Sequence, residues 1–289
     1  MKYKIDHKTI YKYVAPVVQS HHILHLSPRD VSHQVISGHS LIIDPAPASR
    51  KDFIDYNGNP VSLVTIEQEH SSLQFYSHSE IDLAVNNIDV SAQTTGWEEA
   101  VLEARLSGAL DILQYSCISR HTQPDEDIQN YALKSFTAGR PVLEGALELT
   151  QRIFSEFTFD NTATDVSTPI SEVMKMKRGV CQDFAHLQAA CLRVLGIPSR
   201  YVSGYILTHP PEGMKKLAGT DASHAWVSAW CGKEFGWVDF DPTNNMIPYD
   251  EHITFAYGMD FDDVSPVSGV LIGGGDHTVS VAVDVIPVE

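Results

Sequence analysis

The chain has few basic residues, and this scarcity excludes a class of partner. Its 289 residues include 20 Lys and Arg against 37 Asp and Glu, so the formal net charge is -17. Proteins that bind nucleic acid usually present a basic patch or stripe to the phosphates, and no such run of Lys and Arg occurs here. We therefore expect no nucleic acid among the partners of this protein.

Cysteine is also scarce. The four cysteines are Cys117, Cys181, Cys191 and Cys231. They form no CxxC pair, which argues against a disulfide scaffold and against a cysteine-rich zinc site. The histidines His21, His22 and His25 cluster, but nothing nearby completes a metal site, and no HExxH motif occurs. We expect neither a metal nor a cofactor.

Long apolar runs are absent as well. No segment approaches the ~18 consecutive apolar residues that predict a membrane-spanning helix. Residues 1–8 (MKYKIDHK) lack the continuous apolar region of a secretory signal. These absences predict a protein without a membrane partner and a cytoplasmic location.

The first third of the chain alternates apolar and polar residues with the period of a β-strand. Short runs of this kind occur throughout residues 3–85, and turn-forming sequences separate them, such as residues 27–30 (SPRD) and 56–60 (YNGNP). Regular spacing of this kind predicts a small antiparallel β-sandwich. We assign it to a β-rich N-terminal domain of residues 1–90.

From Trp97 the apolar residues take the period of helices. Helical patterns cover residues 97–105, 125–132 and 170–177, and longer ones begin at Pro141 and at Cys181. The helix that begins at Cys181 is predicted to end at Gly196, because a glycine followed by Pro198 terminates a helix. These patterns place several helices in the second part of the chain.

Strand patterns follow these helices. They cover residues 199–207, 222–231 and 236–240, and a loop of residues 209–219 between the first two is long enough to lie over a cleft. A final pair, residues 267–271 and 278–286, flanks a run of three glycines and predicts a closing hairpin. We therefore predict that residues 91–289 form an α+β catalytic domain with a C-terminal β-hairpin.

Cys181 carries the strongest chemical signal in the chain. Residues 179–186 (GVCQDFAH) place it just after a glycine and at the predicted start of a helix. Unpaired N–H groups and the helix dipole at such a position favour a negative sulfur. The other interpretation is that Cys181 is simply buried, which is the usual state of a free cysteine and our expectation for the other three.

Two strand-like segments downstream offer partners for such a thiol. His224 lies in the predicted strand 222–231, and Asp239 and Asp241 share one side of the strand that ends before Pro242. A nucleophile next to a histidine that a carboxylate orients is a recurring catalytic arrangement. The alternatives are a half-buried packing histidine and a local Asp-Pro turn. The period of the strand does not choose between Asp239 and Asp241.

Residues 178–187 (RGVCQDFAHL) and 195–205 (LGIPSRYVSGY) resemble the core of the bacterial transglutaminase-like superfamily. So do residues 224–227 (HAWV) and 236–244 (GWVDFDPTN), and the match runs in the order Cys, His, Asp. Residues 11–17 (YKYVAPV) and 26–29 (LSPR) are similar to the β-rich N-terminal region that often precedes this core in bacteria. Residues 263–270 (DVSPVSGV) resemble the ending of that subgroup, whereas residues 257–261 (YGMDF) lack an arginine expected after the glycine.

The resemblance implies a papain-like fold, in which a helix that bears the cysteine packs on an antiparallel sheet that supplies His and Asp. It implies that Cys181 is the nucleophile, His224 the general base and acid, and Asp241, rather than Asp239, the orienting carboxylate. Members of the superfamily include transglutaminases, cysteine proteases and peptide-cleaving amidases. Fold and triad therefore predict the formation of an acyl-enzyme better than they predict its acceptor.

We predict a cysteine protease that cleaves a peptide or isopeptide amide of a peptide or protein substrate through a Cys-His-Asp triad and a thioester acyl-enzyme. Two alternatives stay open: transglutaminase-type acyl transfer to an amine, and a catalytically silent scaffold that keeps the fold for binding. The N-terminal β domain is expected to position substrate or to cover an apolar face of the catalytic domain. The sequence predicts neither the oligomeric state nor a second oxyanion-hole donor.

Overall fold

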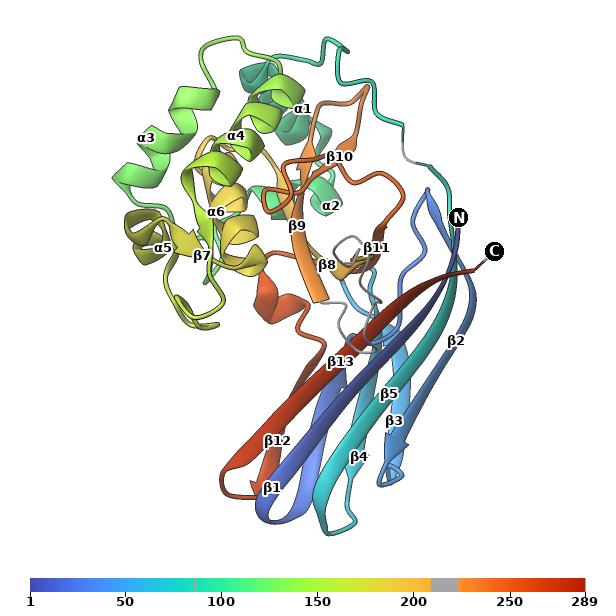
Figure 1. The fold of residues 1–289 in the computed structure, drawn as a ribbon. Helices are drawn as coiled ribbons and strands as arrows, with labels where there is room; N and C mark the ends of the chain where they lie inside the picture. Colours follow the sequence, from blue (N-terminus) through green and yellow to red (C-terminus); the bar gives the residue numbers. More distant parts are fainter. Residues whose placement is uncertain (86, 209–222, 289) are drawn as a thin grey trace, which may run out of the picture.

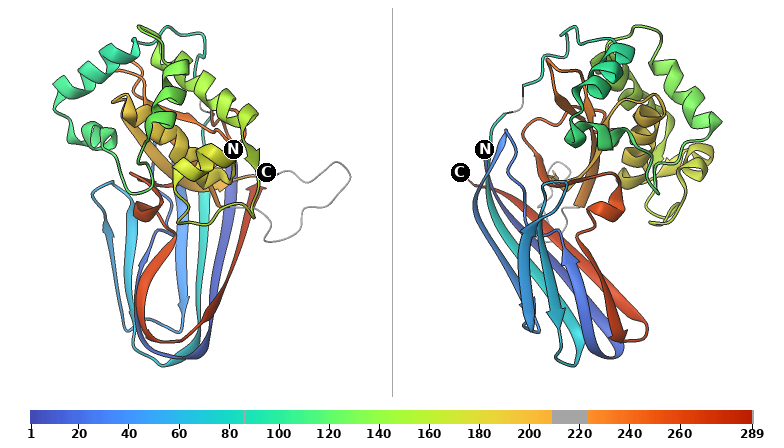
Figure 2. Two further views of the ribbon diagram at one scale, coloured as in Figure 1. Left: turned by 90° about the vertical axis from the view of Figure 1, so that its left-hand side faces the viewer. Right: turned by 180° about the vertical axis from the view of Figure 1, so that it is seen from behind.

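The computed structural model describes residues 1–85, 87–208 and 223–288. Figure 1 shows a group of helices packed against a small sheet, with a set of long curved strands beside them. Seen from the side and from behind in Figure 2, the long strands extend away from the helices.

One long strand, β1 (Lys2–Leu24), organises the larger sheet. Its first half pairs with β5 (His70–Leu83), and its second half pairs with β4 (Pro60–Ile66). The strands β2 (Gln34–Asp44) and β3 (Ser49–Ile54) complete the antiparallel order β2-β5-β1-β4-β3. The period-2 pattern of the first 85 residues therefore predicts the kind of element correctly.

The larger sheet curls over itself. The pairing of β1 with β5 is interrupted between Lys12 and Val17, where the strand bends. Buried side chains from both halves then meet in one core, whose members include Val17, Leu24, Ile43, Val64 and Phe75. This curled, two-layered arrangement confirms the predicted antiparallel, sandwich-like N-terminal region.

The predicted C-terminal hairpin was wrong. The strands β12 (Val267–Gly273) and β13 (His277–Val288) do not pair with each other among the described residues, and both run antiparallel to β1 instead. The glycines at 273–275 have positive φ, and their turn follows the bend of β1, where Ala15 N–H donates to the carbonyl of Gly274. The chain ends thus lie side by side, as Figure 1 shows, and residues 267–288 belong to the N-terminal sheet.

A smaller, four-stranded antiparallel sheet has the order β10-β9-β8-β11. Its strands are β8 (Ser199–Ile206), β9 (Ser223–Trp230), β10 (Trp237–Phe240) and β11 (His252–Gly258). The helices are α1 (Trp97–Ser107), α2 (Leu110–Leu113), α3 (Glu126–Ser135), α4 (Val142–Glu156), α5 (Ile170–Met176) and α6 (Cys181–Val194). Short elements are β6 (Thr158–Phe159), β7 (Arg178–Gly179) and the 3-10 turns η1 (Gln114–Ser116) and η2 (Phe261–Asp263).

Helix α6 packs on one face of this smaller sheet. The alternate residues Ala225, Val227 and Ala229 of β9 join the core that contains Phe184 and Leu187 of α6. The residues between them, Trp226 and Ser228, belong to the opposite face of the strand, and His224 lies near the start of the strand, beside Cys181. A helix that bears the cysteine on an antiparallel sheet confirms the predicted α+β, papain-like class.

The curled sheet meets the same face of the smaller sheet as α6 does, next to Cys181 and Gln182 of that helix. Tyr205 of β8 and Phe255 of β11 pack in one cluster with side chains from β1 and β13, whose buried members are Tyr3, Ile5, Val283 and Val285. A buried hydrophobic cluster of this kind fixes the two sheets relative to each other. Each part of the chain keeps a core of its own, one within residues 13–75 and one within residues 100–264, and this third cluster joins the two parts.

Besides the two-residue strands β6 and β7, two longer strands were not predicted. All six residues of β3 are exposed, so they show no alternation, and all seven residues of β11 are buried, so they show none either. The predicted loop of residues 209–219 lies outside the described residues. In the described ranges, no helix combines the length and apolar character needed to cross a membrane.

Candidate active site

Cys181 is the first residue of α6, and the chain before it is tightly held. The short strand β7 pairs with β6, and the N–H of Asp160 donates to the carbonyl of Gly179 at 2.9 Å. The Asp183 carboxylate then accepts the Val180 N–H at 2.8 Å and the Thr164 hydroxyl at 2.7 Å. These contacts place the cysteine at the N-terminal end of the helix, where backbone N–H groups have no partner within the helix.

Glycine is required at position 179. A Cβ atom there would lie 2.6 Å from the Asp183 Oδ2 atom, which is too close for any non-bonded contact. The carboxylate that holds the turn before Cys181 therefore needs the space that Gly179 leaves. The glycine that precedes Cys181 in the sequence is therefore explained by the space that the Asp183 carboxylate needs.

The four thiols differ in their surroundings. Cys181 is partly exposed, Cys117 is exposed, and Cys191 and Cys231 are buried. Burial raises the pKa of each of the two buried thiols to about 12, so both stay protonated at neutral pH. The interpretation of Cys191 and Cys231 as packing residues is thus supported, but the expectation that Cys117 is buried was wrong, because it lies exposed just after the turn η1. Of the four cysteines, only Cys181 lines the pocket described below.

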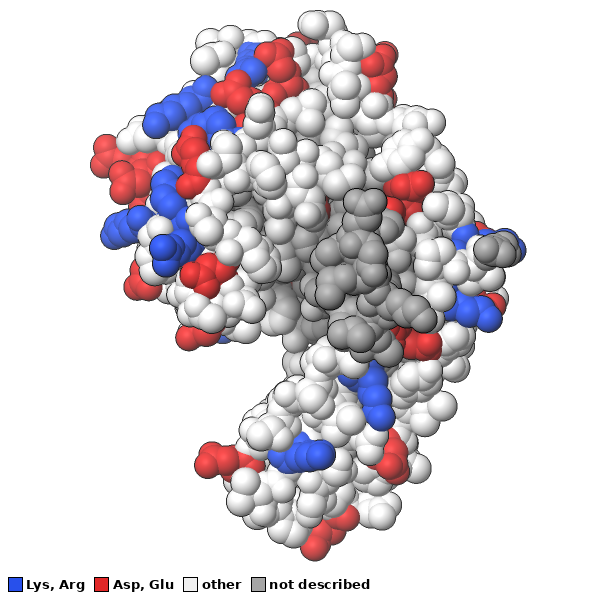
Figure 3. Space-filling model, viewed as in Figure 1, with Lys and Arg blue, Asp and Glu red and all other residues white. Residues whose placement is uncertain are grey.

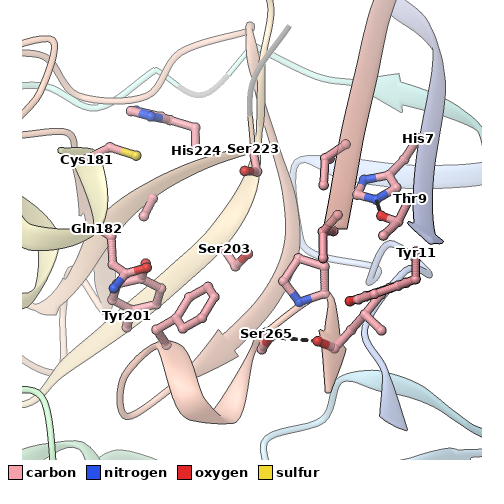
Figure 4. A pocket seen from close by; sticks show the side chains of 16 residues that line it. His7, Thr9, Tyr11, Cys181, Gln182, Tyr201, Ser203, Ser223, His224 and Ser265 are labelled. Atoms are coloured by element: carbon pink, nitrogen blue, oxygen red, sulfur yellow. Dashed lines mark hydrogen bonds between the residues drawn. The ribbon is translucent and has the colours of Figure 1, made fainter. Parts of the chain in front are cut away.

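His224 faces Cys181. Figure 4 shows the sulfur of Cys181 directed toward the imidazole ring of His224, which is only 7% exposed. The Nε2 atom of His224 lies 2.7 Å from the Oδ2 atom of Asp241, which leaves Nδ1 for the thiol. Burial alone would lower the pKa of His224, but the hydrogen bond to Asp241 and the interaction with Cys181 raise it to about 10. At neutral pH the ring is therefore charged, opposite the sulfur.

Asp241 is fully buried and is the centre of a hydrogen-bond network. Its Oδ2 atom contacts His224, His252 at 2.9 Å and Asn244 at 2.7 Å, and its Oδ1 atom accepts the N–H groups of Thr243 and Asn244. Burial by itself would raise the pKa of Asp241, but the hydrogen bonds from His224 and His252 hold it far below the usual range. The carboxylate stays ionised at any physiological pH.

The structure brings Asp241, and not Asp239, to His224. The Asp239 carboxylate accepts the indole N–H of Trp226 at 2.9 Å instead. Asp241 lies just beyond β10, where its N–H donates to the carbonyl of Met246 as the chain turns after Pro242. This turn aims the Asp241 side chain at the start of β9, which the strand period did not indicate.

Sequence reasoning missed two members of this network. His252, on β11, donates from Nε2 to the same oxygen of Asp241 as His224, and its Nδ1 atom is buried without a partner among the described residues. Asn244 lies 3.3 Å from the Nε2 atom of His224 through its Nδ2 atom. Asn244 could have been suspected because it lies three residues after Asp241 in the sequence. His252 could not, because β11 has no alternation of polar and apolar residues that would mark it.

The same three side chains form a potential metal-binding group. Ligand atoms of His224, Asp241 and His252 lie within 4.8 Å of one another. A tetrahedral zinc keeps its nitrogen and oxygen ligands about 3.4 Å apart, because each lies ~2.1 Å from the metal. The Asp241 oxygen is instead 2.7 and 2.9 Å from the two imidazoles, which are hydrogen-bond distances. The geometry fits a proton network better than an ion.

A pocket of about 250 Å³ opens beside Cys181 and His224. Figure 4 shows that both sheets contribute to it, because residues of β1 face the cysteine across the cavity. From the smaller sheet and its helix come Gln182, Tyr201, Ser203, Ser223 and Ala225; from β1 and β13 come His7, Thr9, Tyr11, Val279 and Val281; the connection between them adds Phe261, Ser265, Pro266 and Val267. The N-terminal sheet therefore forms one wall of the site.

Away from Cys181 and His224, the described lining of this pocket is mostly apolar and carries no formal charge. Among the described residues, its lining contains no Lys, Arg, Asp or Glu. Burial lowers the pKa of His7 to about 4, so this wall residue is neutral at neutral pH. Figure 3 likewise shows charged side chains gathered over the outer helices, while the surface between them and the grey segment is mostly uncharged. Among the described residues that line the cavity, His224 is the one whose raised pKa favours a charged side chain.

Comparison with known protein families gives a match for each of the two parts of the chain. A family model of the transglutaminase-like superfamily matches residues 130–242, and a model of the bacterial transglutaminase-like N-terminal region matches residues 3–82. The first match contains Cys181, His224 and Asp241.

Relatives of full length exist. An uncharacterized protein of Mycobacterium tuberculosis is 36% identical over 297 residues, which cover 100% of this chain and 93% of the relative. An uncharacterized protein of Mycobacterium leprae is 29% identical over 98% of this chain and 97% of its own length. The crystal structure of a candidate cysteine protease from Cytophaga hutchinsonii superimposes with a TM-score of 0.76 at 22% identity, covering 100% of this chain and 92% of that one. This similarity confirms the fold across both sheets.

Proposed function

The chain belongs to the transglutaminase-like superfamily, and from this premise we propose that it is a cysteine-dependent hydrolase that cleaves amide bonds of peptides. The observation that carries the proposal is the placement of the Cys181 sulfur between a helix start and a charged imidazole, at the mouth of a pocket. The description of the Cytophaga hutchinsonii protein as a candidate cysteine protease agrees with it. The filled positions of all three triad residues speak against a silent scaffold.

The proposed reaction begins with a thiolate on Cys181 and a proton on His224. The sulfur attacks the carbonyl carbon of the amide, and the carbonyl electron pair moves to oxygen, where the N–H of Cys181 at the helix start can stabilise it. The tetrahedral intermediate then collapses: the C–N bond breaks, and His224 gives its proton to the departing amine. The product of this half-reaction is a thioester on Cys181.

The second half-reaction regenerates the enzyme. His224, now neutral, takes a proton from a water molecule, whose oxygen attacks the thioester carbon. The C–S bond breaks, the carboxylic acid leaves, and the thiolate and imidazolium re-form. Asp241 keeps the same hydrogen bond to Nε2 throughout, so it orients the ring and stabilises its charged form.

Hydrolysis and acyl transfer are separated by the fate of the acyl group. We expect the protein, given a peptide library together with a labelled primary amine, to produce cleaved peptides with free carboxylates and no label, as read by mass spectrometry. Incorporation of the amine at glutamine side chains would instead identify a transferase. The absence of any product with a broad library would contradict both enzymatic assignments.

The uncharged pocket predicts a preference for an apolar substrate side chain next to the scissile bond. Val281 lies on β13, lines the pocket and is 55% exposed, so it tolerates substitution without loss of the core. Val281→Asp places a charge against an apolar side chain and is expected to lower kcat/KM for apolar peptides about tenfold. Steady-state kinetics on a peptide found in the library digest provides the measurement.

A matched control exists on β12, the strand that precedes β13 in the sequence. Val270 on β12 is 69% exposed and does not line the pocket, so Val270→Asp is expected to leave kcat/KM unchanged. An equal loss of kcat/KM in both variants would show that the added carboxylate does not act at the pocket. The proposed preference of the pocket for an apolar substrate side chain would then be wrong.

A further inference from the structure

A second pocket, of about 470 Å³, lies on the face of the smaller sheet that points away from α6. Its floor is formed by Arg200 of β8, Ser228 of β9 and Asp239 of β10, which are direct neighbours in the strand register. Residues 29–33, which follow β1, form another side of it, and aromatic side chains complete the lining: Phe235, Trp237 and Tyr257. It shares no lining residue with the pocket at Cys181.

Arg200 lies in this pocket without an anionic partner. Its guanidinium carbon is 3.6 Å from the centroid of the Trp237 ring and 4.7 Å from that of Tyr257. Among the residues that the structure describes, none accepts a hydrogen bond from Arg200 or forms an ion pair with it within 4.0 Å, and its Nε atom is buried. A buried guanidinium normally has its donors satisfied, because leaving them unpaired is costly.

Two further donors with no partner lie on the same pocket. The Nε atom of Arg29 and the hydroxyl of Ser228 are buried and make no hydrogen bond to a described residue. Arg29 is held from its other side, since its Nη1 atom donates to the carbonyl of Asn57 and to the Asn59 side chain. Its guanidinium also stacks on Tyr257 at 4.1 Å, so it is rigidly placed.

Asp239 attracts Arg200 at a distance, since burial lowers the pKa of Arg200 and Asp239 opposes that shift, but none of the described carboxylates contacts the guanidinium. Asp239 is oriented by the indole N–H of Trp226, and no ion pair joins it to Arg200 within 4.0 Å. Asp30 is exposed and accepts the N–H of Ile36. The Nε atoms of both arginines and the Ser228 hydroxyl are enclosed by protein, whereas the terminal Nη groups of Arg200 are accessible in the pocket and have no acceptor among the described residues.

We propose that this pocket is an oxyanion-binding site that takes a carboxylate or phosphate group. The planar guanidinium of Arg200 offers parallel N–H donors that match either group, and the aromatic faces hold its plane in place. Arg29 adds a second positive charge to the lining of the same pocket. The two arginines come from distant segments, residues 26–29 before β2 and residues 199–206 of β8, so the site exists only where the two sheets meet.

The test is titration of the full-length protein with sodium phosphate and, separately, with sodium acetate, at constant ionic strength against sodium chloride. We expect one of the two anions to raise the thermal midpoint in a saturable manner and to change the fluorescence of Trp237, which stacks on Arg200. Saturation by phosphate alone identifies a phosphate ligand, and saturation by acetate alone identifies a carboxylate. Arg200→Met keeps the apolar stem and is expected to weaken the Kd at least about tenfold.

The control and the second variant keep the proposal falsifiable. Arg120 is an exposed arginine outside the pocket, so Arg120→Met should bind the anion like the wild type. Arg200→Lys preserves the charge and is the variant to use if Arg200→Met does not fold. Lysine lacks the Nε donor and the planar guanidinium, so we expect the Kd to weaken about threefold or more. The proposal is overturned if neither anion acts more strongly than chloride, or if the Arg200 variants bind as tightly as the wild type.

Discussion

Cys181→Ala is expected to abolish amide cleavage, with kcat/KM lower by about 10⁴- to 10⁶-fold. The variant removes the only thiol that lies at a helix start, faces a charged imidazole and lines a pocket, all three at once. Because the remaining residues bind substrate as before, the loss should fall on kcat rather than on KM. The measurement is steady-state kinetics on a peptide from the library digest, with iodoacetamide labelling read by mass in parallel.

Cys117→Ala is the matched control, since Cys117 is also unpaired and exposed but lies away from the pocket. It should retain full activity, and the rate of labelling at Cys181 should be unchanged. The buried thiols of Cys191 and Cys231 should resist labelling, because their raised pKa values keep them protonated. Faster alkylation of Cys117 than of Cys181, or turnover that survives Cys181→Ala, would remove Cys181 as the nucleophile.

The local features of this site could be predicted from the sequence. Helix α6 begins at the predicted residue because Gly179 and the turn before Cys181 are encoded within a few positions. The strand that carries His224 also follows from its own period. The choice between Asp239 and Asp241 required more, because both share one side of β10, and only the turn after Pro242 directs Asp241 to the imidazole.

Features that depend on distant pairing could not be predicted in this way. The pocket wall comes from β1 and β13, which lie at opposite ends of the chain and meet only because β1 offers a free edge along both of its halves. The two C-terminal strand patterns and the glycines between them are typical of a hairpin. Nothing in that part of the sequence indicates that the 23-residue strand β1 is available to pair with both. His252 was missed for a related reason, since a strand buried on both faces has no period to mark its residues.

Asp241→Ala is expected to lower the free energy of unfolding by about 3–5 kcal/mol, because it removes one partner from a buried, charged network. The buried side-chain N–H groups of His224 and His252 would lose their acceptor, and so would the backbone N–H groups of Thr243 and Asn244. Urea denaturation followed by circular dichroism measures the change. Ser167→Ala is a suitable control, because its hydrogen bonds lie on an exposed loop, and it should cost far less. A loss below about 1 kcal/mol for Asp241→Ala would contradict the network.

The isosteric variant Asp241→Asn tests the charge of the same network through pH. The pKa of His224 is about 10 in the folded protein against 6.5 as the ordinary value, so the folded state holds a proton that the unfolded state releases between these values. The stability that Asp241 confers through His224 is therefore complete below pH 6.5 and is lost as the pH rises toward 10, at up to about 1.4 kcal/mol per pH unit. Asp241 has the opposite sign, since its own pKa is depressed from 3.8, and its contribution is lost as the pH falls below that value.

The difference in unfolding free energy between wild type and Asp241→Asn should consequently form a plateau from about pH 4 to 6.5 and decline on both sides. Taking the difference between the two proteins cancels the other titrating groups, such as His7, whose pKa lies near 4 in both. Urea titrations at intervals of pH provide the curve. A difference that stays constant from pH 6.5 to 10 would mean that His224 is neutral in the folded protein, and the thiolate and imidazolium pair proposed for Cys181 would have to be replaced by a neutral thiol that His224 deprotonates only during attack.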